Sequence, residues 1–231
     1  YYINNFFEFK WKNIQIIIHY VNLNLKDIEF IIEKTMRKKL TLDLCNNFIF
    51  INGKNIGVDI GGFLKCLNYV NNDDDLIVKI HTKSNDNWRR SMMNIFSVNG
   101  IYTSIMLLKN KKYGMIGSSY NIEHFRKKFN PQFNINQYYI PMIEYICNKI
   151  NLPFDKINLI QSYFVAGTIF IGKKNIFNEI IDHIDFLYNL CLDLRKTKWI
   201  SGKMKYTYEH ALEIMFGYIP FHNKQYLIGL Y

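Results

Sequence analysis

The stretch NIGVDIGGFLKCLNYVNNDDDLIVKIHTKSNDNWRR, residues 55–90, decides the fold. Three glycines and Asp59 open a helix predicted over residues 63–70, and a short apolar strand beginning at Leu76 follows it. This strand delivers His81, Thr82 and Lys83 to its carboxyl end. An open α/β sheet builds its ligand crevice at the carboxyl ends of its strands. The stretch therefore predicts an α/β fold with a ligand site near these residues.

The turn before this helix has the composition of a ligand-binding loop. Asn55 and Gly57 belong to a turn in which the backbone can approach a ligand closely. The carboxylate of Asp59 can accept hydrogen bonds from the hydroxyls of a ribose or a sugar. Lys83 and Arg89 add positive charge nearby.

Upstream, an apolar run over residues 14–20 is typical of a strand covered on both faces. His19 and Tyr20 end this strand, where Tyr20 can stack on a nucleobase and His19 can hydrogen-bond it; the alternative is that both fill the top of the core. An amphipathic helix over residues 25–40 and a second strand at 48–51 continue the alternation.

Downstream, we expect helices at residues 87–96 and 101–108, a strand at 113–117, a basic helix at 121–129 and a helix running to 150 with Pro141 in its first turn. A strand is predicted over 162–172, then helices over 175–194 and 206–216. Gly167 lies inside that strand, which indicates either close approach of a ligand or a packing bulge.

Five blocks of sequence together resemble a known family. They are Asn55-x-Gly57-x-Asp59-Ile60-Gly61-x-Phe63-Leu64, residues 79–84 with Trp88-Arg89, residues 114–117, residues 164–170, and residues 209–213 with Phe216-Gly217. In this order they resemble the core signature of the rhamnan synthesis F family, glycosyltransferase-like proteins of polysaccharide assembly, over residues 14–218. The chain departs from that signature at Ile56, Gly62 and Ile214, where a basic residue, a proline and an arginine are expected.

The resemblance implies a GT-A-like, Rossmann-related domain with a mostly parallel sheet flanked by helices. It implies transfer of a sugar, with a deoxyhexose such as rhamnose as one candidate, from a nucleotide-diphosphate sugar to a glycan or glycoprotein acceptor. The expected nucleotide-sugar site comprises His19, Tyr20, Asn55, Gly57, Asp59, His81, Lys83, Arg89 and Gly167. Glu209 and His210 are the expected catalytic residues, with Glu209 as the base; the alternative is that Glu209 caps its helix and His210 packs against the sheet.

Dependence on a divalent metal, manganese or magnesium, is left open. Asp73, Asp74 and Asp75 contain the Asp-x-Asp pattern of metal-dependent glycosyltransferases, but they precede their strand instead of following it. We therefore expect a solvated loop there. Lys83 can neutralise the charge of the leaving group in place of a metal; the alternative is that Lys83 is paired with a structural partner.

The net charge of +10 and the pI near 9.3 indicate an anionic partner, for which nucleotide diphosphates, nucleic acid and an anionic membrane surface are the candidates. The basic residues are dispersed, with no stripe that combines them with exposed aromatic side chains, so nucleic acid is not the expected partner. Peripheral membrane association through the basic surface remains open. The alternative functions are a catalytically inactive glycan-binding module and, less favoured, a nucleic-acid-binding protein.

A chain of 231 residues is long enough for one domain, and we expect residues 1–231 to form a single domain excised from a longer chain. Four scattered cysteines without a Cys-x-x-Cys pattern favour reduced thiols and a cytoplasmic location. No apolar run approaches the ~20 residues that span a bilayer. The abundance of Ile, Asn, Lys, Tyr and Phe is typical of an AT-rich viral or microbial genome.

Overall fold

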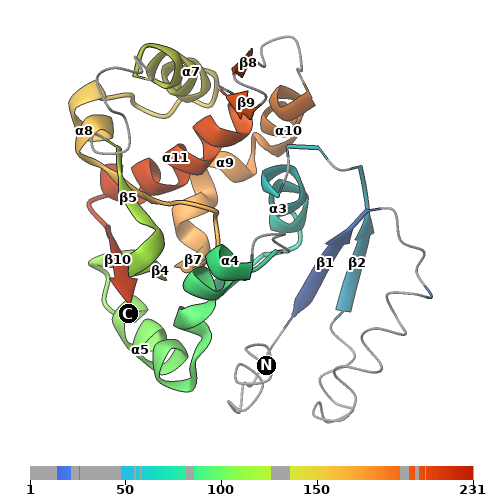
Figure 1. The fold of residues 1–231 in the computed structure, drawn as a ribbon, viewed down its shortest axis with the longest axis vertical. Helices are drawn as coiled ribbons and strands as arrows, with labels where there is room; N and C mark the ends of the chain where they lie inside the picture. The colour runs from blue at the N-terminus through green and yellow to red at the C-terminus, as the bar shows by residue number, and fades with distance from the viewer. Residues whose placement is uncertain are drawn as a thin grey trace.

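The computed structural model describes residues 15–21, 26, 48–54, 56–57, 59–81, 86–125, 136–192, 198–200, 203–205 and 207–230. At residues 86, 89, 136, 137, 198–200 and 203–205 it describes the backbone alone. The described part of the chain is a mixed α/β structure of several small sheets and surrounding helices (Figure 1). The predicted α/β class is therefore confirmed.

The largest sheet in the described residues has four strands in the order β10-β4-β7-β3. Their bounds are β3 Leu76–Lys79, β4 Tyr113–Ser118, β7 Phe170–Lys173 and β10 Tyr226–Leu230. Strand β10 is parallel to β4, whereas β7 is antiparallel to both β3 and β4. The expectation of a mostly parallel sheet is therefore wrong. After a tight turn, the chain enters β7, which lies between β3 and β4 and is antiparallel to both.

The other strands form pairs. Strands β1 (Ile16–Tyr20) and β2 (Phe48–Asn52) are parallel, as the upstream strand-helix-strand pattern indicates. Strand β5 (Ile122–His124) is antiparallel to β6 (Tyr163–Val165), and β8 (Lys198–Ile200) is antiparallel to β9 (Lys203–Lys205). The helix expected over residues 25–40 lies outside the described residues apart from residue 26.

The helices have these bounds: α3 Ile60–Leu67, α4 Asp86–Met93, η2 Asn94–Phe96, α5 Val98–Leu108, η3 Ser119–Asn121, α7 Asn136–Lys149, α8 Lys156–Gln161, η5 Lys174–Phe177, α9 Asn178–Ile181, α10 Ile184–Leu192 and α11 Tyr208–His222. Helix α3 and the pair α4 and α5 lie close to their expected places.

Several downstream expectations are wrong. The strand expected over 162–172 is two strands, β6 and β7, separated by a turn in which Gly167 and Thr168 have φ angles of +84° and +53°. The long helix expected over 175–194 is broken between α9 and α10. Of the helix expected at 121–129, residues 122–124 form a short strand, residue 125 is helical, and residues 126–129 lie outside the described residues. Pro141 lies inside α7 instead of in its first turn. Helix α11 runs on to His222, and the strand after it was not expected.

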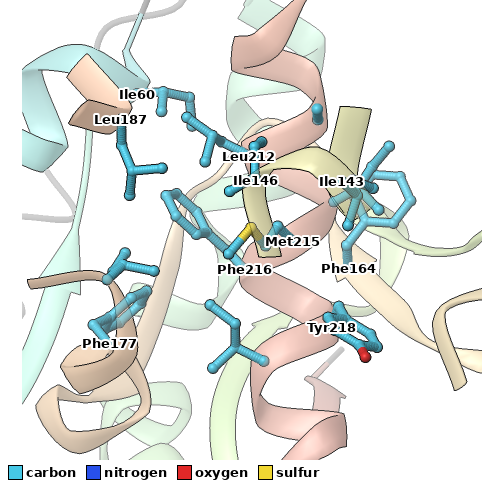
Figure 2. Packing of buried hydrophobic residues seen from close by; sticks show 14 of the residues in the cluster. Ile60, Ile143, Ile146, Phe164, Phe177, Leu187, Leu212, Met215, Phe216 and Tyr218 are labelled. Carbon is cyan, nitrogen blue, oxygen red and sulfur yellow. The ribbon is translucent and has the colours of Figure 1, made fainter. Parts of the chain in front are cut away.

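The sheet has an apolar layer on each face because successive side chains of a strand point to opposite sides. Met115 of β4 and Phe170 of β7 belong to the larger core, whereas their neighbours Ile116 and Ile171 belong to a second core under α4 and α5. The larger core surrounds α11, which is buried along most of its length (Figure 2). Phe216 of α11 packs edge-on against Phe63 of α3, with ring centroids 5.5 Å apart. This packing holds α3 and α11 side by side.

Within the described residues, no single helix is long and apolar enough to cross a membrane; Arg90–Phe96 and Val98–Leu108, bent by 67°, pass that test only as a pair. Cys66, Cys147 and Cys191 are free thiols, and the fourth cysteine lies outside the described residues. Burial raises the pKa of Cys147 and of Cys191 to about 12. These two cysteines are therefore buried in the core as protonated thiols.

Candidate functional site

A buried ion pair joins the start of α3 to the end of β3. Asp59 occupies the position before α3, yet its side chain does not cap the helix. It accepts instead a hydrogen bond from Lys79, with 2.7 Å between Nζ and Oδ2. Lys79 is the last residue of β3 and lies on the inward face with Ile77, 5.6 Å from the ring centroid of Phe63. A charged side chain in such a position needs a partner of opposite charge.

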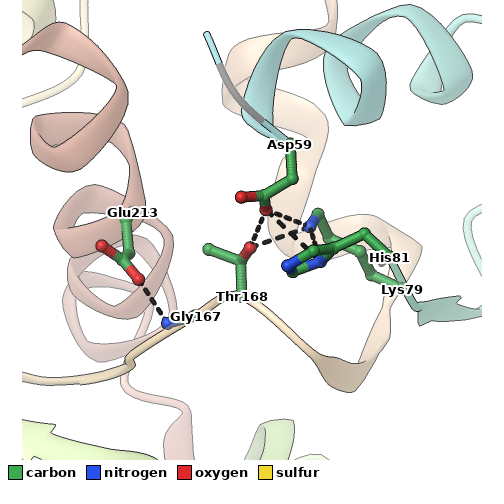
Figure 3. A network of polar contacts seen from close by, with 6 residues as sticks. All are labelled: Asp59, Lys79, His81, Gly167, Thr168 and Glu213. Atoms are coloured by element: carbon green, nitrogen blue, oxygen red, sulfur yellow. Dashed lines mark hydrogen bonds and ion pairs between the residues drawn. The ribbon is translucent and has the colours of Figure 1, made fainter. Parts of the chain in front are cut away.

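Two further side chains complete this cluster (Figure 3). The hydroxyl of Thr168 donates to Asp59 Oδ2 and accepts from Lys79 Nζ at 2.8 Å. His81 Nδ1 lies 3.2 Å from Lys79 Nζ and 3.5 Å from Asp59 Oδ2. An ammonium group only donates, so Lys79 can bond to Nδ1 only when that nitrogen carries no proton. A protonated Nδ1 would instead face the carboxylate of Asp59.

The carboxyl group of Asp59 stays ionised through the ordinary pH range. Burial alone would raise its pKa, but the charges of Lys79 and His81, with hydrogen bonds from Lys79 and Thr168, outweigh burial and lower the pKa of Asp59 to about 2. Only 13% of the Asp59 side chain and 5% of the Lys79 side chain are exposed. The cluster is therefore a fixed, nearly dry pair of opposite charges.

The turn that supplies Thr168 has an uncommon backbone. Two consecutive residues have positive φ, and the second is β-branched, a residue type for which this conformation is a genuine outlier. The backbone N–H of Gly167 donates to Glu213 Oε1 of α11 at 2.5 Å, and that of Thr168 donates to the carbonyl of Val165 at 3.1 Å. At position 167, the φ of +84° would strain any other residue, and an added Cβ would lie 2.5 Å from Met92 Sδ. Strain of this kind gathers at functional sites.

Glu209 approaches the same region from α11. It lies one helical turn before Glu213, on the same side of the helix. Gly57 has φ of +62°, and a Cβ there would lie 3.2 Å from Glu209 Cγ and 2.8 Å from Cys191 Cβ. Glu209 is 9% exposed, and its charge adds to burial in raising the pKa of Cys191. Glu209 thus lies beside the loop that leads to Asp59.

The structure brings together only part of the expected site. Gly57, Asp59, His81 and Gly167 lie in or beside the cluster, with Glu209 next to Gly57. His210 instead contacts the residue before α11, with 2.8 Å between its Nδ1 and the hydroxyl of Thr207.

His19 and Tyr20 end β1 as expected, but the ring of His19 packs between two glycines instead of joining the cluster. A Cβ would lie 2.2 Å from that ring at Gly53 and 2.8 Å from it at Gly62. Burial lowers the pKa of His19. Asn55 and Lys83 lie outside the described residues, as does the side chain of Arg89.

Three residues of the cluster region were missed: Lys79, Thr168 and Glu213. The sequence holds a signal for Lys79, because strand alternation places residue 79 on the same face as residue 77, which is apolar. A lysine that points into the core needs a carboxylate as its partner, and the preceding turn supplies Asp59. The sequence holds no comparable signal for Glu213, because its bond to the turn depends on how α11 packs.

The acidic run lies at the other end of β3. Asp73 is exposed, and its carboxylate accepts a bond from Lys174 Nζ at 2.5 Å. This agrees with the solvated loop expected there. Among the residues that the structure describes, no three His, Cys, Asp or Glu side chains gather closely enough to hold a metal ion. In the cluster, the position beside Asp59 is taken by the ammonium group of Lys79.

Comparisons of the chain with protein-family models, with curated proteins and with solved structures found no match.

Proposed function

We propose that this protein transfers a sugar from a nucleotide-diphosphate sugar to a glycan or glycoprotein acceptor, on a GT-A-like domain. One observation supports the proposal most: four blocks of the family-like signature, far apart in the sequence, meet at one polar cluster. Residues 55–64 supply Asp59, residues 79–84 supply Lys79 and His81, residues 164–170 supply Gly167 and Thr168, and residues 209–217 supply Glu213.

The cluster has the groups that sugar transfer needs at the donor. Asp59 and Thr168 can bond to hydroxyls of the donor, and Lys79 supplies positive charge where the diphosphate departs. Preorganised charge at a leaving group is usually the largest contribution to catalysis of this kind. Lys83 and Arg89 follow β3 along the chain and are proposed to add to that charge.

Glu209 is the proposed base. It lies on α11 beside Gly57, whereas Lys79 reaches Asp59 from β3. An acceptor hydroxyl can approach from the α11 side while the diphosphate leaves toward Lys79. His210 is bonded to Thr207, so we give it a supporting role. Glu213 holds the turn that presents Thr168.

A catalytically inactive glycan- or nucleotide-sugar-binding module is the second candidate. Two features favour it: Asp59 is already paired with Lys79, and the described residues contain no cluster of three metal ligands. Such a module binds the donor without releasing nucleoside diphosphate. For either function, we propose that the protein acts in the cytoplasm, which is a reducing compartment.

A two-stage experiment tests the proposal. Thermal shift is measured with a panel of nucleotide sugars, deoxyhexose donors included, with and without manganese, and release of nucleoside diphosphate is then followed with the donor that stabilises most. We expect Glu209→Gln to bind the donor normally and to lose at least about a hundredfold in rate, the scale of general-base catalysis. Glu144→Gln, a change on the exposed side of α7, is the matched control. Donor binding without release in the wild type would favour the inactive module, and absence of binding would remove both.

A further inference from the structure

The solvent-facing side of α5 carries three large apolar side chains. Val98 is 43% exposed, Tyr102 is 59% exposed and Met106 is 48% exposed. They follow one another at steps of four residues, so they form a continuous stripe on one side of the helix. The stripe is apolar although it faces water.

The stripe is not needed to hold α5 in place. The opposite side of the helix contributes Ile101 and Leu108, exposed by 0% and 2%, to the core under the sheet. The start of α5 is capped by Ser97, whose hydroxyl accepts the N–H of Gly100 at 3.1 Å. The helix is therefore anchored from its inner side.

Positive charge continues the stripe at the end of α5. Lys109, Lys111 and Lys112 are exposed, and at 3.6 residues per turn Lys109 falls between the directions of Val98 and Tyr102. Lys173 of the adjoining strand donates to the carbonyl of Asn110 at 2.9 Å. Burial and the charge of Lys111 lower the pKa of Lys173.

No acidic side chain offsets this charge along the chain. Residues 87–122 contain Arg89, Arg90, Lys109, Lys111 and Lys112, and no Asp or Glu. Asp73, Asp74 and Asp75 precede β3 at this end of the sheet, where Asp73 is paired with Lys174. The α5 surface itself combines an apolar stripe with lysines, so it is complementary to a surface with an apolar interior and anionic headgroups.

We propose that the α5 surface, formed by Val98, Tyr102, Met106, Lys109, Lys111 and Lys112, binds the interface of a membrane containing anionic lipids. Apolar side chains enter the boundary between headgroups and acyl chains, and lysines keep their ammonium groups at the headgroups. Tyrosine is enriched at this depth. Duplex nucleic acid matches the lysines but leaves the aliphatic side chains without an apolar partner.

This orientation leaves the polar cluster uncovered. In the register of β3 with β7, Leu76 is opposite Lys173, and Lys79 is opposite Phe170. The lysine-rich end of the α5 surface and the Asp59–Lys79 pair are thus at opposite ends of these strands. The inference does not rest on the proposed transferase activity.

Co-sedimentation with vesicles tests the proposal. We expect binding to vesicles of phosphatidylcholine with phosphatidylserine, weaker binding to phosphatidylcholine alone, and a decrease with added salt. Each lysine near such a surface contributes about a fivefold change in affinity, so Lys109→Gln with Lys111→Gln should weaken binding roughly 25-fold. Tyr102→Ser with Met106→Ser should weaken it about tenfold, because apolar area is no longer buried.

Matched controls lie on other exposed helices. Lys149→Gln with Lys156→Gln removes the same charge from the ends of α7 and α8, and Ile157→Ser removes an apolar side chain that is 67% exposed. Both should bind as the wild type does. Absence of binding to anionic vesicles, or equal loss in the controls, would overturn the proposal.

Two other partners have distinct results. If duplex or single-stranded DNA binds more tightly than the vesicles and the Tyr102 and Met106 changes have no effect, the surface binds nucleic acid instead. If the wild type is a dimer in sedimentation velocity, and those two changes dissociate it without altering vesicle binding, the stripe is an interface between copies of the chain. Either result would overturn the proposal.

Discussion

Replacing Lys79 by methionine removes the cation of the buried pair and keeps most of the volume of its side chain. The carboxylate of Asp59 would remain, 87% of its side chain shielded, without its closest positive charge. Breaking a buried pair by removing one partner typically costs 3–5 kcal/mol. We expect Lys79→Met to lower the free energy of unfolding by about that amount.

The pKa of Asp59 gives an independent scale. This pKa is lowered from 3.8 to about 2, which corresponds to about 2 kcal/mol of favourable interaction with the ionised form. Lys79 is one of several contributors to that difference, and its removal also leaves the burial of the carboxylate uncompensated. Both lines of reasoning give a cost of a few kcal/mol.

Urea unfolding at pH 7 measures the effect, with Lys65→Met as the matched control. Lys65 also bonds to an aspartate, Asp185, at 3.1 Å, but that aspartate is 86% exposed. Surface pairs contribute about 0–1 kcal/mol. If Lys79→Met costs no more than Lys65→Met, the buried pair does not have the role described above. The double variant Asp59→Asn with Lys79→Met should lose less than the two single changes added together.

Three further expectations concern pH, backbone and metal. A lowered pKa means that the contribution of Asp59 is complete above pH 3.8 and is lost as pH falls through about 2. Acid unfolding of the wild type should therefore show about 2 kcal/mol more loss of stability than Asp59→Asn across that window. Gly57→Ala should cost about 2–4 kcal/mol in thermal unfolding, because φ is +62° and the added methyl lies 2.8 Å from a side-chain carbon of α10; Gly172→Ala, where the nearest atoms are 3.5 Å away, should cost under ~1 kcal/mol, and equal costs would contradict this. Asp73→Ala with Asp75→Ala should leave nucleotide-sugar affinity unchanged in calorimetry, and manganese-dependent binding abolished by that pair would place a metal site in the acidic loop.

Local sequence patterns predict the strands that consist of short apolar runs. The apolar runs at β1, β2, β3 and β4 are strands, and the pairing of Asp59 with the segment after β3 follows from the order of glycine turn, helix and strand. The alternation within β3 also predicts that Lys79 points inward, although this position is not among the expected site residues. Lys83 was given the role of the cation instead, and it lies outside the described residues.

Tertiary contacts decided what sequence patterns did not. Residues 162–172 have the pattern of one strand, and Gly167 indicates a local irregularity without showing that the chain turns there. The bond from Gly167 to Glu213 and the contact with Met92 fix that turn, and both partners are distant in the sequence. The last strand was missed for a similar reason, because β10 depends on the edge that β4 offers.

We propose that the cluster of Asp59, Lys79, His81 and Thr168 binds the donor sugar nucleotide. Calorimetric titration of the wild type and of Thr168→Val with the donor that gives the largest thermal shift tests it most directly. The valine keeps the shape of threonine and removes the hydroxyl that bonds to Asp59 and Lys79. We predict that affinity falls about tenfold or more, the scale of a hydrogen bond to a charged group, while Lys65→Met binds as the wild type does. Equal affinity of all three proteins, or no donor that binds the wild type, would contradict the claim.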